Sequence, residues 1–311
     1  MTTDCDVPVV VAGAGPAGVS AALWLDDFGV PFAWVDATGE IGGMLQRVHN
    51  RITNVPGGNF DDGASLTDAY KQQLQQLALA PRTAEIDRLD VESSRLSLTE
   101  HSGETLTTRR VILATGTRYR QLGIEGEQQG LGDYVSQSAT GDGDRVAGQP
   151  VAVVGGGDAG FENALRMADR GSSVTMLLRN DEFRARPSFV EDVRAHDAID
   201  IAPIPSVVRR IEPIDGGCRL HIDRRGDTTT LDVACLFVRI GVDPVVPDGC
   251  DGLSTDGGGH LIVDGDGRTS HDHILAAGDV TSTPLRCVAT AVGQGARTAR
   301  TCAVDLGYLT S

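Results

Sequence analysis

Gly13-Ala14-Gly15-Pro16-Ala17-Gly18 is the stretch that decides the fold of this chain. It follows the apolar run Val7-Pro8-Val9-Val10-Val11, which predicts a buried parallel strand, and it precedes a helix-like segment. A second stretch, Gly155-Gly156-Gly157-Asp158-Ala159-Gly160, has the same setting after the apolar run Val151–Val154. Glycines without side chains let a backbone turn approach a pyrophosphate at a helix N-terminus. Together the two turns predict that one chain binds two dinucleotides.

The residue at the end of the next strand indicates which dinucleotide each turn holds. In the first unit Phe32–Val35 leads into Asp36, about 20 residues past the glycines, where a carboxylate can accept hydrogen bonds from a ribose diol. Asp36 therefore suits FAD or NAD. In the second unit Val174–Leu178 leads into Arg179, and Arg184 follows. Arginines there favour a ribose with a 2′-phosphate, hence NADPH over NADH, unless they are simply solvated helix-end charges.

Two further apolar runs, Val111–Gly116 and Ile274–Asp279, each end in small residues. Either one alone fits an ordinary strand end. The order along the chain is more informative: a glycine turn, Ala-Thr-Gly, a second glycine turn and then Ala-Gly-Asp. This order resembles that of the two-dinucleotide flavoprotein reductases, above all the low-molecular-weight thioredoxin reductases and the thioredoxin reductase-like ferredoxin-NADP reductases. The resemblance extends over nearly the whole chain.

The resemblance implies an α/β fold of two Rossmann-like, three-layer domains, the second inserted into the first. Residues 1–118 and 244–311 would form the FAD-binding domain, and residues 119–243 the NAD(P)H-binding domain. Sequence patterns predict helices and strands within this frame. The helices are predicted over 17–28, 66–79, 161–170 and 289–306, and a small antiparallel sheet over 218–222 and 228–233.

The resemblance also implies the binding residues of both cofactors. Asp279 would bind the ribityl chain of FAD, and the backbone of Arg286–Val288 would face the pyrimidine end of the flavin at the start of a helix. The residues carried over to the FAD site are Gly13, Gly15, Pro16, Ala17, Gly18, Asp36, Gly42, Gly43, Met44, Thr115, Gly116, Gly278, Asp279, Arg286, Cys287 and Val288. Those carried over to the NADPH site, with NADH as the alternative, are Gly155, Gly157, Asp158, Ala159, Gly160, Arg179, Arg184 and Gly241.

A pair of cysteines is missing at a position that the resemblance makes important. Thioredoxin reductases of this type carry Cys-x-x-Cys shortly before the second glycine turn, where this chain has Ser138 and Gly141. A hydroxyl and a hydrogen cannot form or attack a disulfide. The six cysteines elsewhere contain no Cys-x-x-Cys and no metal-ligand spacing, so no metal site is expected. We expect that this chain is not a competent thioredoxin reductase.

The sequence therefore predicts an FAD-dependent NAD(P)H oxidoreductase that passes electrons to an acceptor other than a disulfide. That acceptor would be a ferredoxin- or flavodoxin-like carrier or a small molecule. The alternatives are a biosynthetic flavoenzyme, an NAD(P)H oxidase, and a non-catalytic flavin-binding sensor or partner subunit. No catalytic residue is certain, and His49 and Cys287 are candidates beside ordinary roles in a polar loop and in packing.

Composition limits the partners. The formal net charge of −16 argues against nucleic acid and anionic membranes, whose phosphates would be repelled, and weakens the case for an acidic ferredoxin. No 18-residue apolar run occurs, and the N-terminus lacks a basic start, so we expect a cytoplasmic protein. Because relatives are commonly homodimers, we also expect a homodimer.

Overall fold

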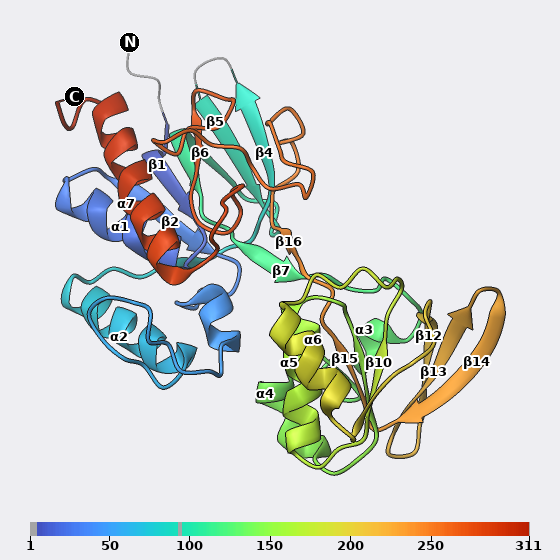
Figure 1. Cartoon of the computed structure of the whole chain (residues 1–311). Coiled ribbons are helices and arrows are strands. Elements are labelled where there is room, and N and C mark those ends of the chain that lie inside the picture. Colours follow the sequence, from blue (N-terminus) through green and yellow to red (C-terminus); the bar gives the residue numbers. More distant parts are fainter. Residues whose placement is uncertain (1–4, 93–94, 311) are drawn as a thin grey trace. The chain divides into compact units, whose positions relative to one another are not determined.

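The computed structural model describes residues 5–92 and 95–310 (Figure 1). The chain divides into two compact units: a first unit of Met1–Arg118 with Asp243–Ser311, and a second unit of Tyr119–Val242. The two crossings between them, β7 (Thr117–Tyr119) and β16 (Val242–Pro244), pair as a two-stranded ribbon.

The first unit is built on a seven-stranded mixed sheet. β1 pairs in parallel with β2 and β6, whereas β4 and β5 extend the sheet in antiparallel fashion beyond β6. Val9, Val10 and Val11 of β1 are fully buried, as their continuous apolar run predicts for a central parallel strand. The strands are β1 (Val7–Ala12), β2 (Phe32–Asp36), β3 (Arg82–Thr83), β4 (Ile86–Glu92), β5 (Arg95–Glu100), β6 (Thr105–Leu113) and β17 (Ile274–Ala276).

Two helices, α1 (Pro16–Asp27) and α7 (Val288–Asp305), pack against each other in this unit (Figure 1). They approach closely because a side chain is missing at the crossing: a Cβ at Gly295 would lie 2.2 Å from the carbonyl oxygen of Ala17. This crossing fixes the start of α1, where the first glycine turn ends.

The helix predicted over 66–79 is displaced in the structure. It forms α2 (Gly63–Gln76), after the short helix η1 (Gly43–Arg47). Asp62 and Ser65 form a capping box that starts the helix before its first apolar residue. Ala78 then adopts a positive φ of 54°, which ends the helix early.

The second unit has three layers (Figure 1). A five-stranded parallel sheet is covered by α5 (Asp158–Asp169) and α6 (Pro187–Ala195), and by an antiparallel sheet through apolar contacts such as those of Leu220 and Ile222. The antiparallel sheet contains one strand more than the two predicted. The parallel strands are β8 (Val135–Ser136), β9 (Val151–Val154), β10 (Val174–Leu177), β11 (Ile199–Ile201) and β15 (Cys235–Val238). The antiparallel strands are β12 (Val207–Ile214), β13 (Gly217–Arg224) and β14 (Asp227–Val233). The unit also contains the short helices α3 (Glu127–Gly130), α4 (Ala139–Asp142) and η2 (Gly143–Val146).

Candidate functional site

The first glycine turn is closed on one side and open on the other. A Cβ at Gly13, where φ is +112°, would lie 2.2 Å from the carbonyl oxygen of Ala114, and one at Gly18 would lie 1.9 Å from that of Gly13. A Cβ at Gly15 would meet nothing within 4 Å. Gly15 is the N-cap of α1 and has no side chain, so no side-chain cap occupies the N-terminus of the helix. This arrangement fits a phosphate group.

A second segment lies against this turn. The Gly42 N–H donates to the carbonyl oxygen of Ala14 at 2.8 Å, and a Cβ at Gly43 would lie 3.2 Å from the Cα atom of Gly15. The structure therefore brings together the Gly13–Gly18 and Gly42–Met44 segments that the sequence assigned to one ligand.

Asp36 also contacts the turn, and its carboxylate is already engaged. Its Oδ2 atom accepts the N–H of Ala14 at 2.8 Å, and its Oδ1 atom accepts the N–H and hydroxyl of Thr38 at 2.9 and 2.7 Å. A carboxylate has about four acceptor positions, so one position remains for a ribose hydroxyl.

The turn after β17 reaches the same place from the other end of the chain. A Cβ at Gly278 would lie 2.8 Å from the Cβ of Ala17. Gln294 of α7 holds this turn, since its Oε1 atom accepts the Gly278 N–H at 2.7 Å. The Asp279 carboxyl is half-buried; burial raises its pKa, and nearby Arg286 and His260 oppose that rise. Such a carboxylate, beside the glycine turn, can accept hydrogen bonds from hydroxyl groups.

The remaining residues predicted for this site differ in their surroundings. Cys287 is the N-cap of α7, and hydrogen bonds from the Thr290 side chain and backbone lower the pKa of its thiol. The Thr115 hydroxyl donates to the carbonyl oxygen of Val245, so it has a structural partner. His49 is exposed on the loop after η1. Arg286 is exposed, whereas Val288 and Met44 are half-buried. The carbonyl oxygen of Gly116 accepts the Val245 N–H at 3.0 Å.

The second glycine turn repeats the geometry of the first. A Cβ at Gly155, where φ is +139°, would lie 2.1 Å from the carbonyl oxygen of Arg239, and one at Gly160 would lie 2.2 Å from that of Gly155. Gly157 caps α5 without a side-chain hydrogen bond, and a Cβ there would meet open space. The edge of the second sheet therefore also offers a cradle for phosphate.

An arginine-rich loop lies against this second cradle. The Arg184 N–H donates to the carbonyl oxygen of Gly156 at 2.9 Å. Arg186 bonds the Asp158 carboxylate through its backbone N–H at 2.7 Å and its Nε atom at 2.9 Å. The side chains of Arg179 and Arg184 are exposed. Two guanidinium groups on a segment whose backbone contacts the glycine turn can bind a 2′-phosphate.

Sequence reasoning missed Arg186. Its position two residues after Arg184 is the signal that points to it, because residues two apart in an extended segment lie on the same side. Its guanidinium also stacks over the ring of Phe189 at 4.4 Å. Gly241, predicted for this site, has a φ of +102°, and its carbonyl oxygen accepts the N–H of Arg120 at 3.0 Å.

The segment that lacks the two cysteines is ordered by polar contacts. Ser138 is the N-cap of α4, and its Oγ atom accepts the Gly141 N–H at 3.1 Å. Asn163 of α5 accepts the Ala139 N–H at 2.7 Å and so ties the segment to the helix that follows the second glycine turn. The Ser138 hydroxyl therefore has a structural role in this segment.

All six cysteines are free thiols. Cys218, Cys235, Cys250 and Cys302 are buried. Burial raises the pKa of the Cys250 thiol to about 11 and the pKa of the other three thiols to about 12. A thiol with so high a pKa is a poor nucleophile.

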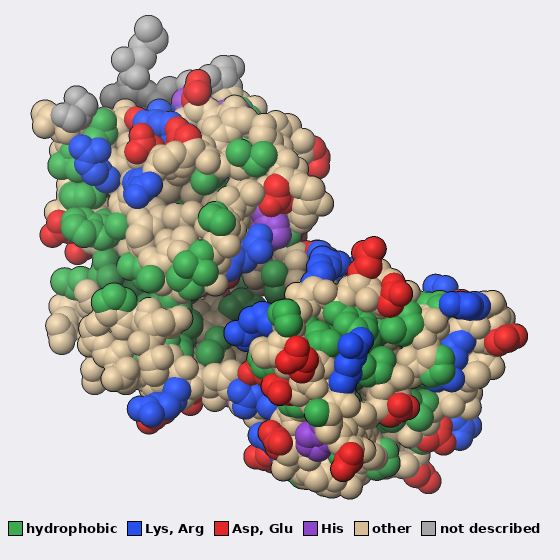
Figure 2. All heavy atoms as spheres, viewed as in Figure 1, with side chains coloured by type: hydrophobic (Ala, Val, Ile, Leu, Met, Phe, Trp, Pro, Cys, Tyr) green, Lys and Arg blue, Asp and Glu red, His purple; other side chains and the backbone are tan. Residues whose placement is uncertain are grey.

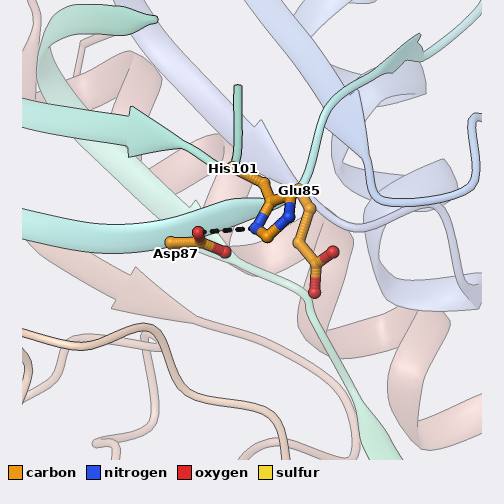
Figure 3. A group of neighbouring side chains, drawn as sticks. All are labelled: Glu85, Asp87 and His101. Atoms are coloured by element: carbon orange, nitrogen blue, oxygen red, sulfur yellow. Dashed lines mark hydrogen bonds and ion pairs between the residues drawn. The ribbon is translucent and has the colours of Figure 1, made fainter. Parts of the chain in front are cut away.

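A group on the sheet edge has the composition of a metal site. Glu85, Asp87 and His101 place one ligand atom each within 4.8 Å of one another (Figure 3). All three are exposed, and the His101 Nδ1 atom lies 2.9 Å from the Asp87 carboxylate. Asp87 raises the pKa of His101, first through this hydrogen bond. We assign the group as a surface ion pair.

Surface charge in the second unit is mixed rather than one-sided. Figure 2 shows acidic and basic side chains interspersed over its visible face. The arginine loop is thus a local feature.

Among the described residues, none of the helices combines the length and the apolar character that crossing a bilayer requires.

Known proteins with similar sequences define the class. A model of the pyridine nucleotide-disulphide oxidoreductase family matches residues 7–295. The chain is 35% identical over 294 residues to the bifunctional thioredoxin reductase/thioredoxin of Mycobacterium leprae; the match covers 92% of this chain but 63% of that longer protein. It is 32% identical over 292 residues to a thioredoxin reductase of Mycolicibacterium smegmatis, with 92% of each covered.

Solved structures agree. Lactococcus lactis thioredoxin reductase in its FR conformation superposes with a TM-score of 0.81 at 27% identity, covering 98% of this chain and 100% of that one. The chain therefore belongs to the pyridine nucleotide-disulphide oxidoreductase family, and within it to the thioredoxin reductase-like flavoproteins, which use FAD and NADPH. The predicted family, cofactors and α/β fold are confirmed.

Proposed function

We propose that this chain is an NADPH-dependent flavoenzyme that delivers electrons to an acceptor other than a disulfide, either a ferredoxin- or flavodoxin-like carrier or a small molecule. The observation that carries the proposal is the pair Ser138 and Gly141, where the resembling reductases have their cysteines. The Ser138 hydroxyl caps a helix, and four of the six thiols are buried. Since the sequence contains no Cys-x-x-Cys, the dithiol of the resembling reductases has no counterpart in it.

FAD, when bound, supplies hydride acceptance and onward electron transfer. The residues of this chain bind and orient. In the first unit the Gly13–Gly18 turn cradles the pyrophosphate, Asp36 accepts from the adenosine ribose, and Asp279 accepts from the ribityl hydroxyls. The structure supports this division through the short contacts that join Gly42 and Gly278 to the first turn.

In the second unit the Gly155–Gly160 turn cradles the pyrophosphate of NADPH. Arg179 and Arg184 neutralise its 2′-phosphate, and the Asp158–Arg186 pair holds the arginine loop on the turn. The Arg184 N–H bond to Gly156 supports this assignment, since it joins the loop to the cradle. The same bond opposes the non-catalytic alternative, because a sensor that binds only flavin has no use for this loop.

The first experiment is anaerobic mixing of the purified holoenzyme with NADPH, followed by the visible flavin absorbance. We expect complete bleaching. An oxidised protein thiol substrate such as thioredoxin should then leave the flavin reduced, whereas ferredoxin, flavodoxin, a quinone or oxygen should restore its colour. Persistent colour with NADPH would favour the binding module, and rapid reoxidation by oxidised thioredoxin would refute the proposal.

A matched gain-of-function variant sharpens this test. Ser138→Cys/Gly141→Cys places two thiols at the N-terminus of α4, where helix amides lower thiol pKa values. We expect this variant, unlike Ser138→Cys alone, to form a disulfide that thiol titration detects. Reoxidation by oxidised thioredoxin in the double variant alone would show that the missing cysteines determine the acceptor.

We also propose that the protein is a homodimer and acts in the cytoplasm. Exposed apolar side chains of the first unit, Trp24 on α1 and Tyr308 after α7, support a contact between copies. Light scattering during size-exclusion chromatography tests the assembly, and a monomer at micromolar concentration would refute it.

A further inference from the structure

A glutamine of α7 holds the backbone turn that carries Asp279. The hydrogen bonds between β17 and β6 end where the Ala277 N–H donates to the carbonyl oxygen of Leu113 at 3.0 Å. The next amide, that of the buried Gly278, lies past the end of β17 and donates to the Oε1 atom of Gln294 at 2.7 Å. A buried amide needs a partner, so this side chain provides the acceptor that the sheet no longer supplies.

The carbonyl group of Gly278 is held as well. It accepts the hydroxyl of Thr281 at 2.7 Å and the Thr281 N–H at 2.9 Å, and Thr281 is fully buried. The Nε2 atom of Gln294 donates to the Thr281 hydroxyl at 3.4 Å. Both peptide groups of Gly278 therefore belong to one hydrogen-bonded network. Because the second of these peptide groups leads directly into Asp279, the network fixes the direction in which the Asp279 side chain leaves the backbone.

The same glutamine lies where α7 crosses α1. A Cβ at its neighbour Gly295 would lie 2.2 Å from the carbonyl oxygen of Ala17, and the Ser20 hydroxyl donates to the carbonyl oxygen of Val292 at 2.8 Å. Gly278 itself has a φ of +81°, and a Cβ there would lie 2.8 Å from the Cβ of Ala17. Since Ala17 belongs to the first glycine turn, Gln294 joins the turn of Asp279 to that glycine turn through α7.

We propose that Gln294 is a positioning residue for FAD, which acts through the Gly278 turn to direct the Asp279 carboxylate at the ribityl hydroxyls. This inference rests on the proposed function, which assigns those hydroxyls to Asp279. Hydrogen bonds weaken steeply as their angle departs from linear, so a carboxylate on a relaxed turn loses affinity for its ligand. An amide side chain suits this role, because it supplies both an acceptor and a donor and adds no negative charge beside Asp279.

The test is a double-mutant cycle on FAD affinity, measured by flavin fluorescence in apoprotein prepared from the holoenzyme. Gln294→Met keeps the length of the side chain and removes its hydrogen bonds, so we expect it to weaken FAD binding about tenfold. Asp279→Ala should weaken FAD binding about 30-fold. If Gln294 acts through Asp279, the double variant should also lose about 30-fold, whereas independent effects would multiply to about 300-fold.

A second cycle and a shorter ligand support the test. Thr281→Val removes the hydroxyl that holds the Gly278 carbonyl, and its loss of FAD affinity should likewise vanish in the Asp279→Ala background. ADP, which lacks the ribityl chain, should bind Gln294→Met as it binds the wild type in calorimetry. Gln73→Met is the matched control, because Gln73 of α2 is exposed and its exchange should leave FAD affinity unchanged.

Three results would overturn this inference and leave the proposed function intact. They are unchanged FAD affinity in Gln294→Met, losses that multiply in the Gln294→Met/Asp279→Ala variant, and an equal loss of FAD and ADP affinity in Gln294→Met. An Asp279→Ala variant that binds FAD as tightly as the wild type would instead overturn the role of Asp279 in the proposed function, and this inference with it.

Discussion

The two glycine turns share a backbone and differ in what lies beside it. At Gly13 and Gly155 an added Cβ would lie 2.2 and 2.1 Å from a backbone carbonyl oxygen, and each turn leads into a helix without a side-chain cap. Beside the first turn is the carboxylate of Asp36, which accepts the Ala14 N–H. Beside the second is the loop of Arg184, bonded to the turn through its N–H. The same backbone turn therefore lies beside a carboxylate in one unit and beside an arginine loop in the other, and we predict that this difference in charge selects the ribose.

The largest expected effect comes from adding one methyl group to either turn. Gly13→Ala forces a Cβ against backbone at a positive φ, which costs on the order of 3 kcal/mol or more. We expect Gly13→Ala to be purified without flavin, and Gly155→Ala to keep flavin that NADPH no longer reduces. Flavin absorbance per protein and anaerobic NADPH titration measure both.

Gly252→Ala is the control, because a Cβ at Gly252 would meet open space. Loss of flavin in Gly155→Ala together with normal flavin content in Gly13→Ala would reverse the assignment of the two turns.

Charge beside the second turn should give the next largest effect. Arg179→Gln/Arg184→Gln removes the two guanidinium groups that we propose bind the 2′-phosphate, so we expect KM for NADPH to rise about 30-fold while KM for NADH stays constant. Steady-state kinetics with both coenzymes measure this. Arg209→Gln is the control, since Arg209 pairs with Asp223 in the antiparallel sheet. A parallel loss with NADH would contradict phosphate recognition.

Acid should destabilise the first unit through Asp256. Its folded pKa of about 2 lies below the ordinary value of 3.8, so its stabilisation is present above about pH 4 and lost as pH falls through 2. We expect Asp256→Asn to lower the free energy of unfolding by about 1 kcal/mol at pH 7 and by almost nothing at pH 2.

Tryptophan fluorescence during urea unfolding measures this effect in the first unit alone, because both tryptophans, Trp24 and Trp34, belong to it. The exposed Asp272→Asn is the control. An equal effect of Asp256→Asn at both pH values would show that the amide changes the turn by another route.

The smallest expected effect concerns the ion pair that holds the arginine loop. Asp158→Asn weakens a partly exposed pair with Arg186, and such pairs contribute up to about 1 kcal/mol. We expect KM for NADPH to rise about threefold with flavin content unchanged. Arg186→Gln should have the same effect, and additive losses in the double variant would show that the two residues act separately.

Sequence alone predicted much of the fold, because its main signals are local. The runs before Gly13 and Gly155 predicted buried strands, and their spacing to the glycines predicted strand–turn–helix units. The start of α2 was predicted three residues late, because the capping box of Asp62 and Ser65 forms outside the apolar pattern. The assignment of individual residues to FAD and NADPH stays a prediction.

The order of motifs by itself determined the family and its two cofactors, because turn glycines and the charged residue at a strand end can be recognised from the sequence alone. Tertiary structure decided which of those residues meet. Only folding lays Gly278 on Ala17 and Gly43 on Gly15. These contacts join segments separated by tens to hundreds of residues. Their energies depend on packing distance and solvent exclusion, which no local pattern encodes.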